Sequence, residues 1–130
     1  MSAKEVKDDR KYTKDHEWAK EQDGLIVVGI TAFAVDQLGD ITLVGLDVKE
    51  GDQVEAGKPF GTIESVKTLS DLFAPVSGTV KAVNAALDDA PELINDDCWG
   101  KGWMISIEPS KPGDLMDSGA YRSLLAASDH

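Results

Sequence analysis

The sequence is poor in the residues that build disulfides, metal sites and catalytic triads. Its single cysteine, Cys98, excludes a disulfide within the chain and fits a reducing compartment. Its only histidines, His16 and His130, supply neither a multi-histidine metal site nor a histidine-based triad. The acidic pair Asp96 and Asp97 is interpreted as a solvated loop. We therefore predict no catalytic residues and no metal site.

Long apolar runs are also missing, and basic residues are outnumbered. No run is long enough to span a membrane, and the charged N-terminal stretch lacks the apolar core of a secretory signal. We therefore expect a cytoplasmic protein. There are 13 Lys and Arg against 24 Asp and Glu, which gives a net charge of −11. Because this charge repels nucleic acid and anionic membranes, neither is expected as a partner; it favours solubility and basic partner surfaces.

What the sequence does contain is a series of short apolar runs separated by turn residues. A length of 130 residues predicts one domain. We expect residues 1–11, which are polar, to form a flexible N-terminal segment and residues 12–130 to form the domain. Strands are predicted at 25–30, 41–46, 60–66, 69–73, 79–83 and 103–107, with a weaker alternating pattern at 16–20. We expect Pro109 and Pro112 to close the last strand.

Helices are predicted to be few and short. Thr31 is a good N-cap and Gly39 a good stop, so the spacing predicts a helix near 32–38. Helical spacing of apolar residues predicts a C-terminal helix over 120–127, and Pro91 predicts a helical turn over 91–94. Many short strands with glycine-rich turns favour a mainly β fold, a flattened barrel or sandwich.

One lysine, Lys67, falls at the turn between two predicted strands, 60–66 and 69–73. A hairpin tip lifts its amine clear of the body, where a large enzyme can reach it. Nothing adjacent in the sequence suggests a desolvating pocket, and an exposed primary amine is a poor base at neutral pH. Two interpretations therefore remain, a solvated charge on a turn or an acceptor of acylation.

The sequence around Lys67 matches a wider ordered pattern. The matching segments are 12–18, 28–31, 38–40, 64–67, 70–72, 74–78, 83–84, 91–95 and 100–103. Over residues 11–108 the chain resembles the glycine cleavage system H proteins, a family of lipoyl carriers. The resemblance implies a flattened β-barrel or sandwich of the lipoyl type, the barrel-sandwich hybrid. It departs from the family at Cys98-Trp99, where Pro-Tyr is common.

The resemblance also implies a function in glycine catabolism and one-carbon metabolism. Lys67 would carry lipoate in amide linkage, attached by a lipoylating enzyme, and the protein would be a carrier and not an enzyme. The P protein, glycine decarboxylase, would transfer the aminomethyl group of glycine to the arm. The T protein, aminomethyltransferase, would pass the one-carbon unit to tetrahydrofolate, and the L protein, dihydrolipoamide dehydrogenase, would reoxidise the arm. A carrier that docks successive enzymes is expected to be a monomer.

Three carboxylates are candidates for accessory roles. The loaded arm ends in a cationic amine, with which Glu17 first and Asp71 second could form a charge-assisted hydrogen bond. Glu64 and Asp71, which flank the lysine, would help the lipoylating enzyme to recognise its site. Each could instead be an ordinary surface carboxylate.

Three alternatives to the glycine cleavage carrier remain open. An H-like carrier in a lipoate relay would keep the same hairpin. A biotinyl carrier domain shares the lysine on a hairpin, although its usual flanking methionines are replaced here by Val66 and Thr68. A binding or scaffold domain would leave Lys67 unmodified.

Overall fold

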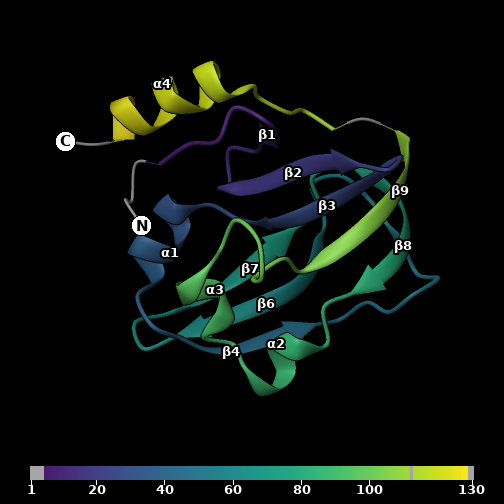
Figure 1. Cartoon of the computed structure of the whole chain (residues 1–130), viewed down its shortest axis with the longest axis horizontal. Helices are drawn as coiled ribbons and strands as arrows, with labels where there is room; N and C mark the ends of the chain where they lie inside the picture. Colours follow the sequence, from purple (N-terminus) through teal and green to yellow (C-terminus); the bar gives the residue numbers. More distant parts are fainter. Residues whose placement is uncertain (1–4, 112, 129–130) are drawn as a thin grey trace.

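Two antiparallel β-sheets form the body of the protein in a computed structural model that describes residues 5–111 and 113–128 (Figure 1). The six-stranded sheet has the order β1 (Lys11–Tyr12), β2 (Glu17–Gln22), β3 (Leu25–Ile30), β9 (Ile105–Lys111), β8 (Ser77–Val83) and β5 (Gln53–Val54). The three-stranded sheet has the order β4 (Ile41–Leu46), β6 (Pro59–Ser65) and β7 (Leu69–Phe73). The mainly β prediction is confirmed, and the described strands form two sheets without closing into one barrel.

The main core lies between these two sheets. Its buried side chains are mostly aliphatic and come from both sheets and from the first helix, for example Val28, Val44, Ile63 and Ile105. Phe60 is the one large aromatic side chain buried in this cluster within the part of the chain that the structure describes. The scarcity of aromatic residues therefore leaves Val, Ile and Leu to provide most of the buried apolar area.

The short helix predicted near 32–38 is confirmed as α1 (Ala32–Leu38). Thr31 caps it by accepting a 3.3 Å hydrogen bond from the backbone N–H of Ala34. Gly39 ends it with φ at 79°, in the left-handed region that favours glycine. Two further helices, α2 (Ala86–Asp89) and α3 (Leu93–Asp96), follow β8. The sequence did not predict α2, and α3 begins two residues later than the predicted helical turn.

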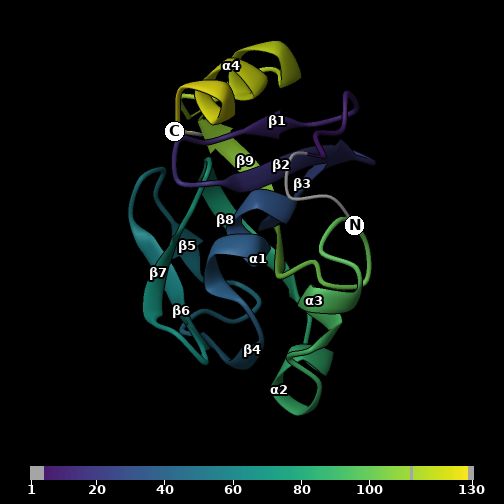
Figure 2. The same ribbon diagram turned by 90° about the vertical axis from the view of Figure 1, so that its left-hand side faces the viewer.

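The predicted C-terminal helix is confirmed as α4 (Ser118–Ser128), which packs beside β1 (Figure 2). A second apolar cluster joins its buried Tyr121 and Leu125 to Tyr12 and Trp18. The rings of Tyr12 and Tyr121 stack at a centroid distance of 4.5 Å. These contacts hold the helix against the six-stranded sheet, on the side away from the main core.

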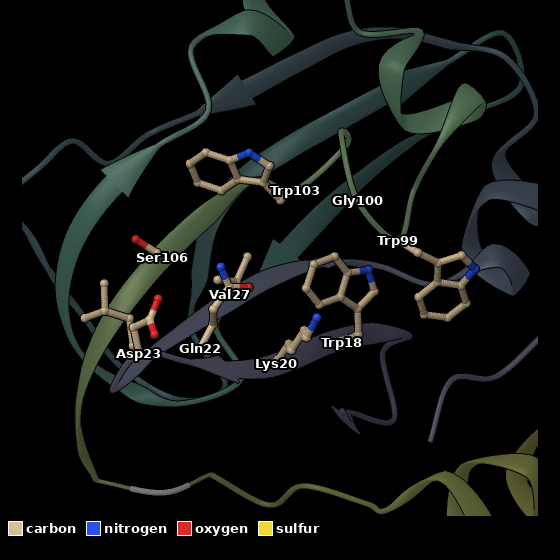
Figure 3. Close-up of a pocket in the computed structure, with 10 residues that line it drawn as sticks. Trp18, Lys20, Gln22, Asp23, Val27, Trp99, Gly100, Trp103 and Ser106 are labelled. Atoms are coloured by element: carbon tan, nitrogen blue, oxygen red, sulfur yellow. The ribbon is translucent and has the colours of Figure 1, made fainter. Parts of the chain in front are cut away.

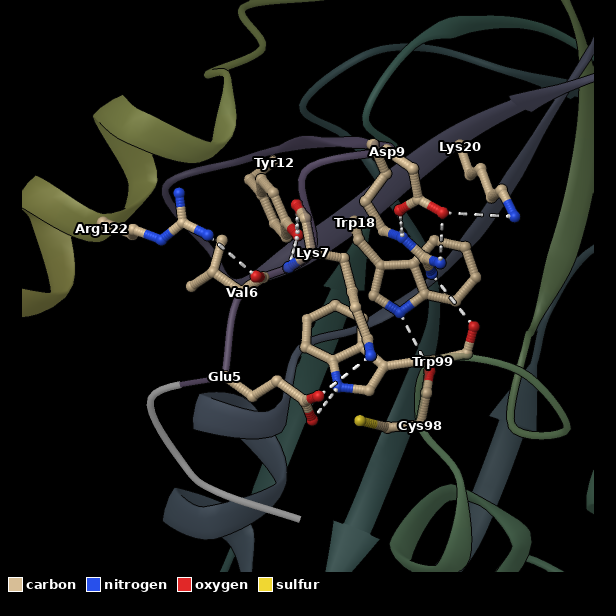
Figure 4. A network of polar contacts seen from close by, with 11 residues as sticks. Glu5, Val6, Lys7, Asp9, Tyr12, Trp18, Lys20, Cys98, Trp99 and Arg122 are labelled. Atoms are coloured by element: carbon tan, nitrogen blue, oxygen red, sulfur yellow. Dashed lines mark hydrogen bonds and ion pairs between the residues drawn. The ribbon is translucent and has the colours of Figure 1, made fainter.

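The N-terminal residues 5–10 contact the same region (Figure 4). The guanidinium of Arg10 lies 4.6 Å from the ring centroid of Trp18 and 5.3 Å from that of Trp99, and it donates to the Trp99 carbonyl. The Lys7 backbone N–H donates to the Tyr12 hydroxyl at 2.8 Å, and Arg122 of α4 donates to the Val6 carbonyl. A domain boundary after residue 11 stays a prediction, and residues 1–4 lie outside the described residues.

The last strand differs from its prediction at both ends. It begins at Ile105, and it continues through Pro109 to Lys111 instead of closing at the proline. The pairing of β9 with β3 ends at Ile107, so beyond this point β8 is the only described strand that pairs with β9. Pro109 is tolerated because it lies where β9 has become an edge strand. The predicted stop at Pro112 lies outside the described residues.

In the part of the chain that the structure describes, no helix has the length and apolar character needed to cross a membrane.

Candidate functional site

Lys67 lies at the tip of the hairpin that joins β6 to β7, where a tight turn holds the backbone. The Ser65 N–H donates to the Thr68 carbonyl at 2.9 Å, so Val66 and Lys67 are the central residues of the turn. The Ser65 hydroxyl oxygen accepts from the N–H groups of Lys67 and Thr68, both at 3.2 Å. The backbone is thus ordered by its own hydrogen bonds, while the Lys67 side chain is exposed.

The hairpin tip is also fixed from outside, by the segment that links α1 to β4 (Figure 1). The Val66 N–H donates to the Asp40 carbonyl at 3.1 Å. Asn95 of α3 holds that segment, because its side chain accepts from the Ile41 N–H at 2.9 Å and donates to the Gly39 carbonyl at 3.0 Å. A Cβ at Gly39 would come within 3.4 Å of Cε of Lys67, so the lysine stem lies over this glycine.

Glu64 and Asp71 lie on the outward face of the three-stranded sheet. Glu64 is opposite Leu43 on one side and Leu69 on the other, and Asp71 is opposite Thr62. Side chains alternate along a strand, so Leu69 and Asp71 share one face of β7. The two carboxylates therefore flank Lys67 as the sequence interpretation supposed, although their recognition role stays a prediction.

A small hollow of about 160 Å³ lies between this hairpin and β2. Its apolar lining includes Ile30, Leu38, Ile63 and Leu72, and its polar lining includes Glu17 and Asp71. A second hollow, of about 410 Å³, lies on the other side of Glu17 and is lined by Thr13, Phe73 and Asp114 among others. Glu17 and Asp15 line both hollows. Because Asp71 also lines the small hollow, two of the sequence-predicted residues, Glu17 and Asp71, meet in one cavity beside the lysine hairpin.

Glu17 is a buried carboxyl with only 2% of its surface exposed, so it is not an ordinary surface carboxylate. One carboxyl oxygen accepts from the Thr13 hydroxyl at 2.6 Å and the other from the Phe73 N–H at 3.3 Å. Burial raises the pKa of Glu17 from its ordinary value of 4.5 to about 8, although both hydrogen bonds act to lower it. At neutral pH the carboxyl is therefore mostly protonated and uncharged.

His16 also contributes to the wall of the small hollow, and Tyr121 of α4 contacts it from behind, a link that the sequence interpretation missed. His16, which lines the hollow, has φ at 68°, an uncommon backbone conformation for a residue with a side chain. The Tyr121 hydroxyl lies 2.8 Å from Nδ1 of His16 and 2.7 Å from the Thr31 hydroxyl. Burial lowers the pKa of His16, so its ring is neutral at pH 7. The C-terminal helix thus reaches the site through Tyr121.

A larger groove, of about 460 Å³, crosses the outer side of β2, β3 and β9 (Figure 3). Trp18, Trp99 and Trp103 line it together with Lys20 and Asp23. Lys67, Glu64, Asp71 and Glu17 do not line it, so it is separate from the hairpin site. In residues 5–111 and 113–128, no group of three or more His, Cys, Asp or Glu side chains is arranged to hold a metal ion.

Comparison with known proteins assigns the chain to a family. The family model described as "Glycine cleavage H-protein" matches residues 10–128. The chain belongs to the glycine cleavage H-protein family. The resemblance stated for residues 11–108 is thus confirmed, and the match continues through α4.

Individual relatives agree with this assignment over nearly their full lengths. The chain is 53% identical over 125 residues to the glycine cleavage system H protein of Anaeromyxobacter sp. (strain K), covering 93% of this chain and 96% of the relative. It is 50% identical to that of Synechococcus sp. (strain JA-3-3Ab), covering 91% and 93%. The crystal structure of the H protein from Mycobacterium marinum superposes with a TM-score of 0.88 at 41% identity, covering 93% of this chain and 99% of that chain.

Proposed function

We propose that the protein carries the aminomethyl group of glycine between the enzymes of the glycine cleavage system on a lipoyl group attached to Lys67. The observation that carries this proposal is an exposed lysine on a rigidly held hairpin tip, beside a hollow that contains a buried carboxyl. Membership of the glycine cleavage H-protein family supports it. In this function the protein is a carrier and not an enzyme.

The residues around Lys67 fit a lipoyl arm. The Lys67 amine, at an exposed tip, would hold the lipoyl group in an amide bond, which removes its charge. Ile30, Leu38, Ile63 and Leu72 would contact the hydrocarbon part of the arm, because they line the small hollow with apolar surface. When attached, lipoate supplies a disulfide that accepts the aminomethyl group and is later regenerated by reoxidation.

Glu17 and Asp71 would hold the cationic amine of the cargo and exclude water from it. Glu17 keeps its proton in the ligand-free hollow, since burial raises the pKa of its carboxyl to about 8. A cation within hydrogen-bond distance favours the ionised carboxylate and lowers that pKa. Glu17 would therefore release its proton as the amine enters and accept a charge-assisted hydrogen bond from it. Asp71, exposed and lining the same hollow, would assist from the rim.

The partners follow from this role. The P, T and L proteins would meet the arm in turn, and a lipoylating enzyme would attach it. Glu64 and Asp71 would contribute to recognition by the attaching enzyme, because both lie on the outward face of the sheet that carries Lys67. The protein would act as a monomer.

The first test is the intact mass of the protein from its native host, followed by peptide mapping of any adduct. We expect a lipoyl or octanoyl group on Lys67, its loss in Lys67→Arg, and its retention in the control Lys81→Arg, which changes an exposed lysine on β8. The modified protein, and not Lys67→Arg, should then support glycine decarboxylation by the P protein. Biotin on Lys67, or an unmodified Lys67 in cells that lipoylate other proteins, would contradict the proposal.

A further inference from the structure

Thr13 contacts the buried carboxyl of Glu17 from the turn that joins β1 to β2. Its backbone N–H donates to the Glu17 carbonyl at 2.9 Å, and its carbonyl accepts from the His16 N–H at 3.1 Å. Thr13 is itself buried, with 9% of its surface exposed. Because a β-branched side chain has few allowed rotamers, the hydroxyl is held in one direction beside the carboxyl.

The hydrogen bonds around the Thr13 hydroxyl decide where its proton points. The hydroxyl oxygen accepts from the backbone N–H groups of Asp15 and Glu17, both at 3.2 Å. A hydroxyl has one proton and two acceptor lone pairs, so these N–H groups occupy both lone pairs. The proton is therefore donated to Oε1 of Glu17, 2.6 Å away. Thr13 donates to the carboxyl and has no lone pair left to accept from it.

Glu17 thus lies between two donors whose direction is fixed. The second donor is the Phe73 N–H of β7, which donates to Oε2 at 3.3 Å. Such donors favour the ionised carboxylate, because they offer no acceptor to the proton of the acid. The 2.6 Å bond from Thr13 has the length of hydroxyl bonds to an ionised carboxylate, roughly 2.5–2.7 Å. The surroundings therefore favour the anion, while burial, which raises the pKa of Glu17 to about 8, opposes it.

We propose that Thr13 is a positioning residue that holds Glu17 ready to ionise, and so sets how tightly the site holds the cationic amine of the cargo. This inference rests on the proposed function, because it requires the loaded arm to reach Glu17. As the amine enters, Glu17 releases its proton to solvent, and the Thr13 hydroxyl already points at an oxygen of the new anion. Neither donor has to turn, so the carboxylate forms without a reorganisation of these partners.

Thr13 acts on the cargo only through Glu17. It lines the second hollow and not the small hollow that would receive the arm. Thr13 is uncharged, so its replacement leaves in place the other ionisable groups that line the two hollows or lie behind them. In the described part of the chain these are Lys14, Asp15, His16, Asp71, Asp114 and Tyr121. A difference between wild type and a Thr13 variant therefore reports the hydroxyl.

The first measurement uses the unmodified full-length protein and needs no lipoyl group. The carbon-13 NMR signal of the Glu17 carboxyl is followed against pH. Thr13→Val keeps the side-chain shape without the hydroxyl, so we expect the titration to move to higher pH by about one to two pH units, the equivalent of one hydrogen bond to a charged group. Thr13→Ser should return it to the wild-type pH. The matched control Thr79→Val removes a β8 hydroxyl that bonds Gln53 and should titrate as wild type.

The second measurement is the rate at which the isolated loaded protein loses its cargo. Water releases the aminomethyl group from the sulfur as formaldehyde and ammonium and leaves the thiol, which intact mass detects. At pH 7 we expect Thr13→Val to lose the group about tenfold faster than wild type. Thr13→Ser and Thr79→Val should keep the wild-type rate. In a Glu17→Gln background Thr13→Val should have no further effect, because the two residues act as one unit.

The outcomes separate this inference from the function on which it rests. An unshifted Glu17 titration in Thr13→Val would overturn the inference and leave the carrier function standing. A protein that cannot be lipoylated at Lys67 or loaded would overturn the carrier function, and the role of Thr13 in holding the cargo with it. A shifted titration with an unchanged rate of cargo loss would contradict the inference. An equal effect of Thr13→Val in the wild-type and Glu17→Gln backgrounds would contradict it too, because Thr13 would then be only structural.

A measurement on the wild-type protein keeps the inference testable if Thr13→Val does not fold. The Thr13 hydroxyl proton, held in a bond to Glu17, should give a proton NMR signal that is protected from exchange with water. We expect this signal to move in step with the titration of the Glu17 carboxyl. A hydroxyl signal that does not respond to that titration would contradict the positioning role.

Discussion

Glu17→Gln should remove a pH dependence of stability that arises from the burial of this carboxyl. The folded protein holds the Glu17 proton up to about pH 8, whereas the unfolded chain loses it near 4.5. Between these values the folded state binds more protons, so the free energy of unfolding falls as pH rises, by about 1.4 kcal/mol per pH unit. The contribution is fully present below pH 4.5 and is lost by about pH 8. From pH 5 to pH 7 the loss is roughly 3 kcal/mol.

The assay is urea-induced unfolding of wild type and variant from pH 5 to pH 8. Glutamine has the size of the protonated carboxyl and keeps an acceptor for the Phe73 N–H, so the fold should be maintained. Because both proteins contain His16 and every other titrating group, the difference between their slopes isolates Glu17. Glu21→Gln, which changes an exposed residue of the same strand, is the control and should keep the wild-type slope.

Parallel curves for wild type and Glu17→Gln would refute this reasoning, because they would mean that Glu17 is ionised in the folded protein. The same variant also tests the role proposed for the site. A neutral amide cannot release a proton to become the anion that a cationic amine requires, so the loaded arm should hydrolyse faster while acylation of Lys67 stays normal. An unchanged hydrolysis rate would remove Glu17 from the function.

Two further substitutions test how the site is held. Tyr121→Phe removes the hydroxyl that forms hydrogen bonds with His16 and Thr31. We expect the free energy of unfolding in denaturant to fall by about 1–3 kcal/mol. A variant as stable as wild type would show that these hydrogen bonds do not fix α4 to the wall of the small hollow. Asn95→Ala leaves the Ile41 N–H and the Gly39 carbonyl without this partner. Hydrogen exchange at the Val66 N–H should then become faster, and an unchanged rate would contradict the positioning role of Asn95.

The local features of the fold were predictable because their causes are local. The period of apolar residues predicted the main strands, and the pairing of Thr31 with Gly39 predicted both ends of α1. Lys67 could be placed on a turn for the same reason. The continuation of β9 through Pro109 was not predictable, since it depends on β3 ending its pairing at Ile107.

The geometry of the site was less predictable because it joins distant segments. The burial of Glu17 depends on Phe73, 56 residues away, and the position of His16 depends on Tyr121, 105 residues away. The resemblance identified Glu17 as a candidate, but only the pairing of strands shows that it is buried and that burial raises its pKa. The row of Leu43, Glu64 and Leu69 likewise follows from strand register, which no single segment specifies.

The alternation of side chains along β7 explains why the register of the lysine hairpin matters. Leu69 projects outward beside Lys67, whereas Ser70 and Leu72 line the small hollow that would receive the arm. One strand therefore contributes to both regions, and Asp71, which shares the outward face with Leu69, lies where they meet at the rim of the hollow. A slip of one residue would exchange these two faces, because the side-chain period is two. The turn closed by Ser65 and the bond from Val66 to Asp40 both oppose such a slip, so a tip held on two sides maintains Leu69 on the outward face and Leu72 in the lining of the hollow.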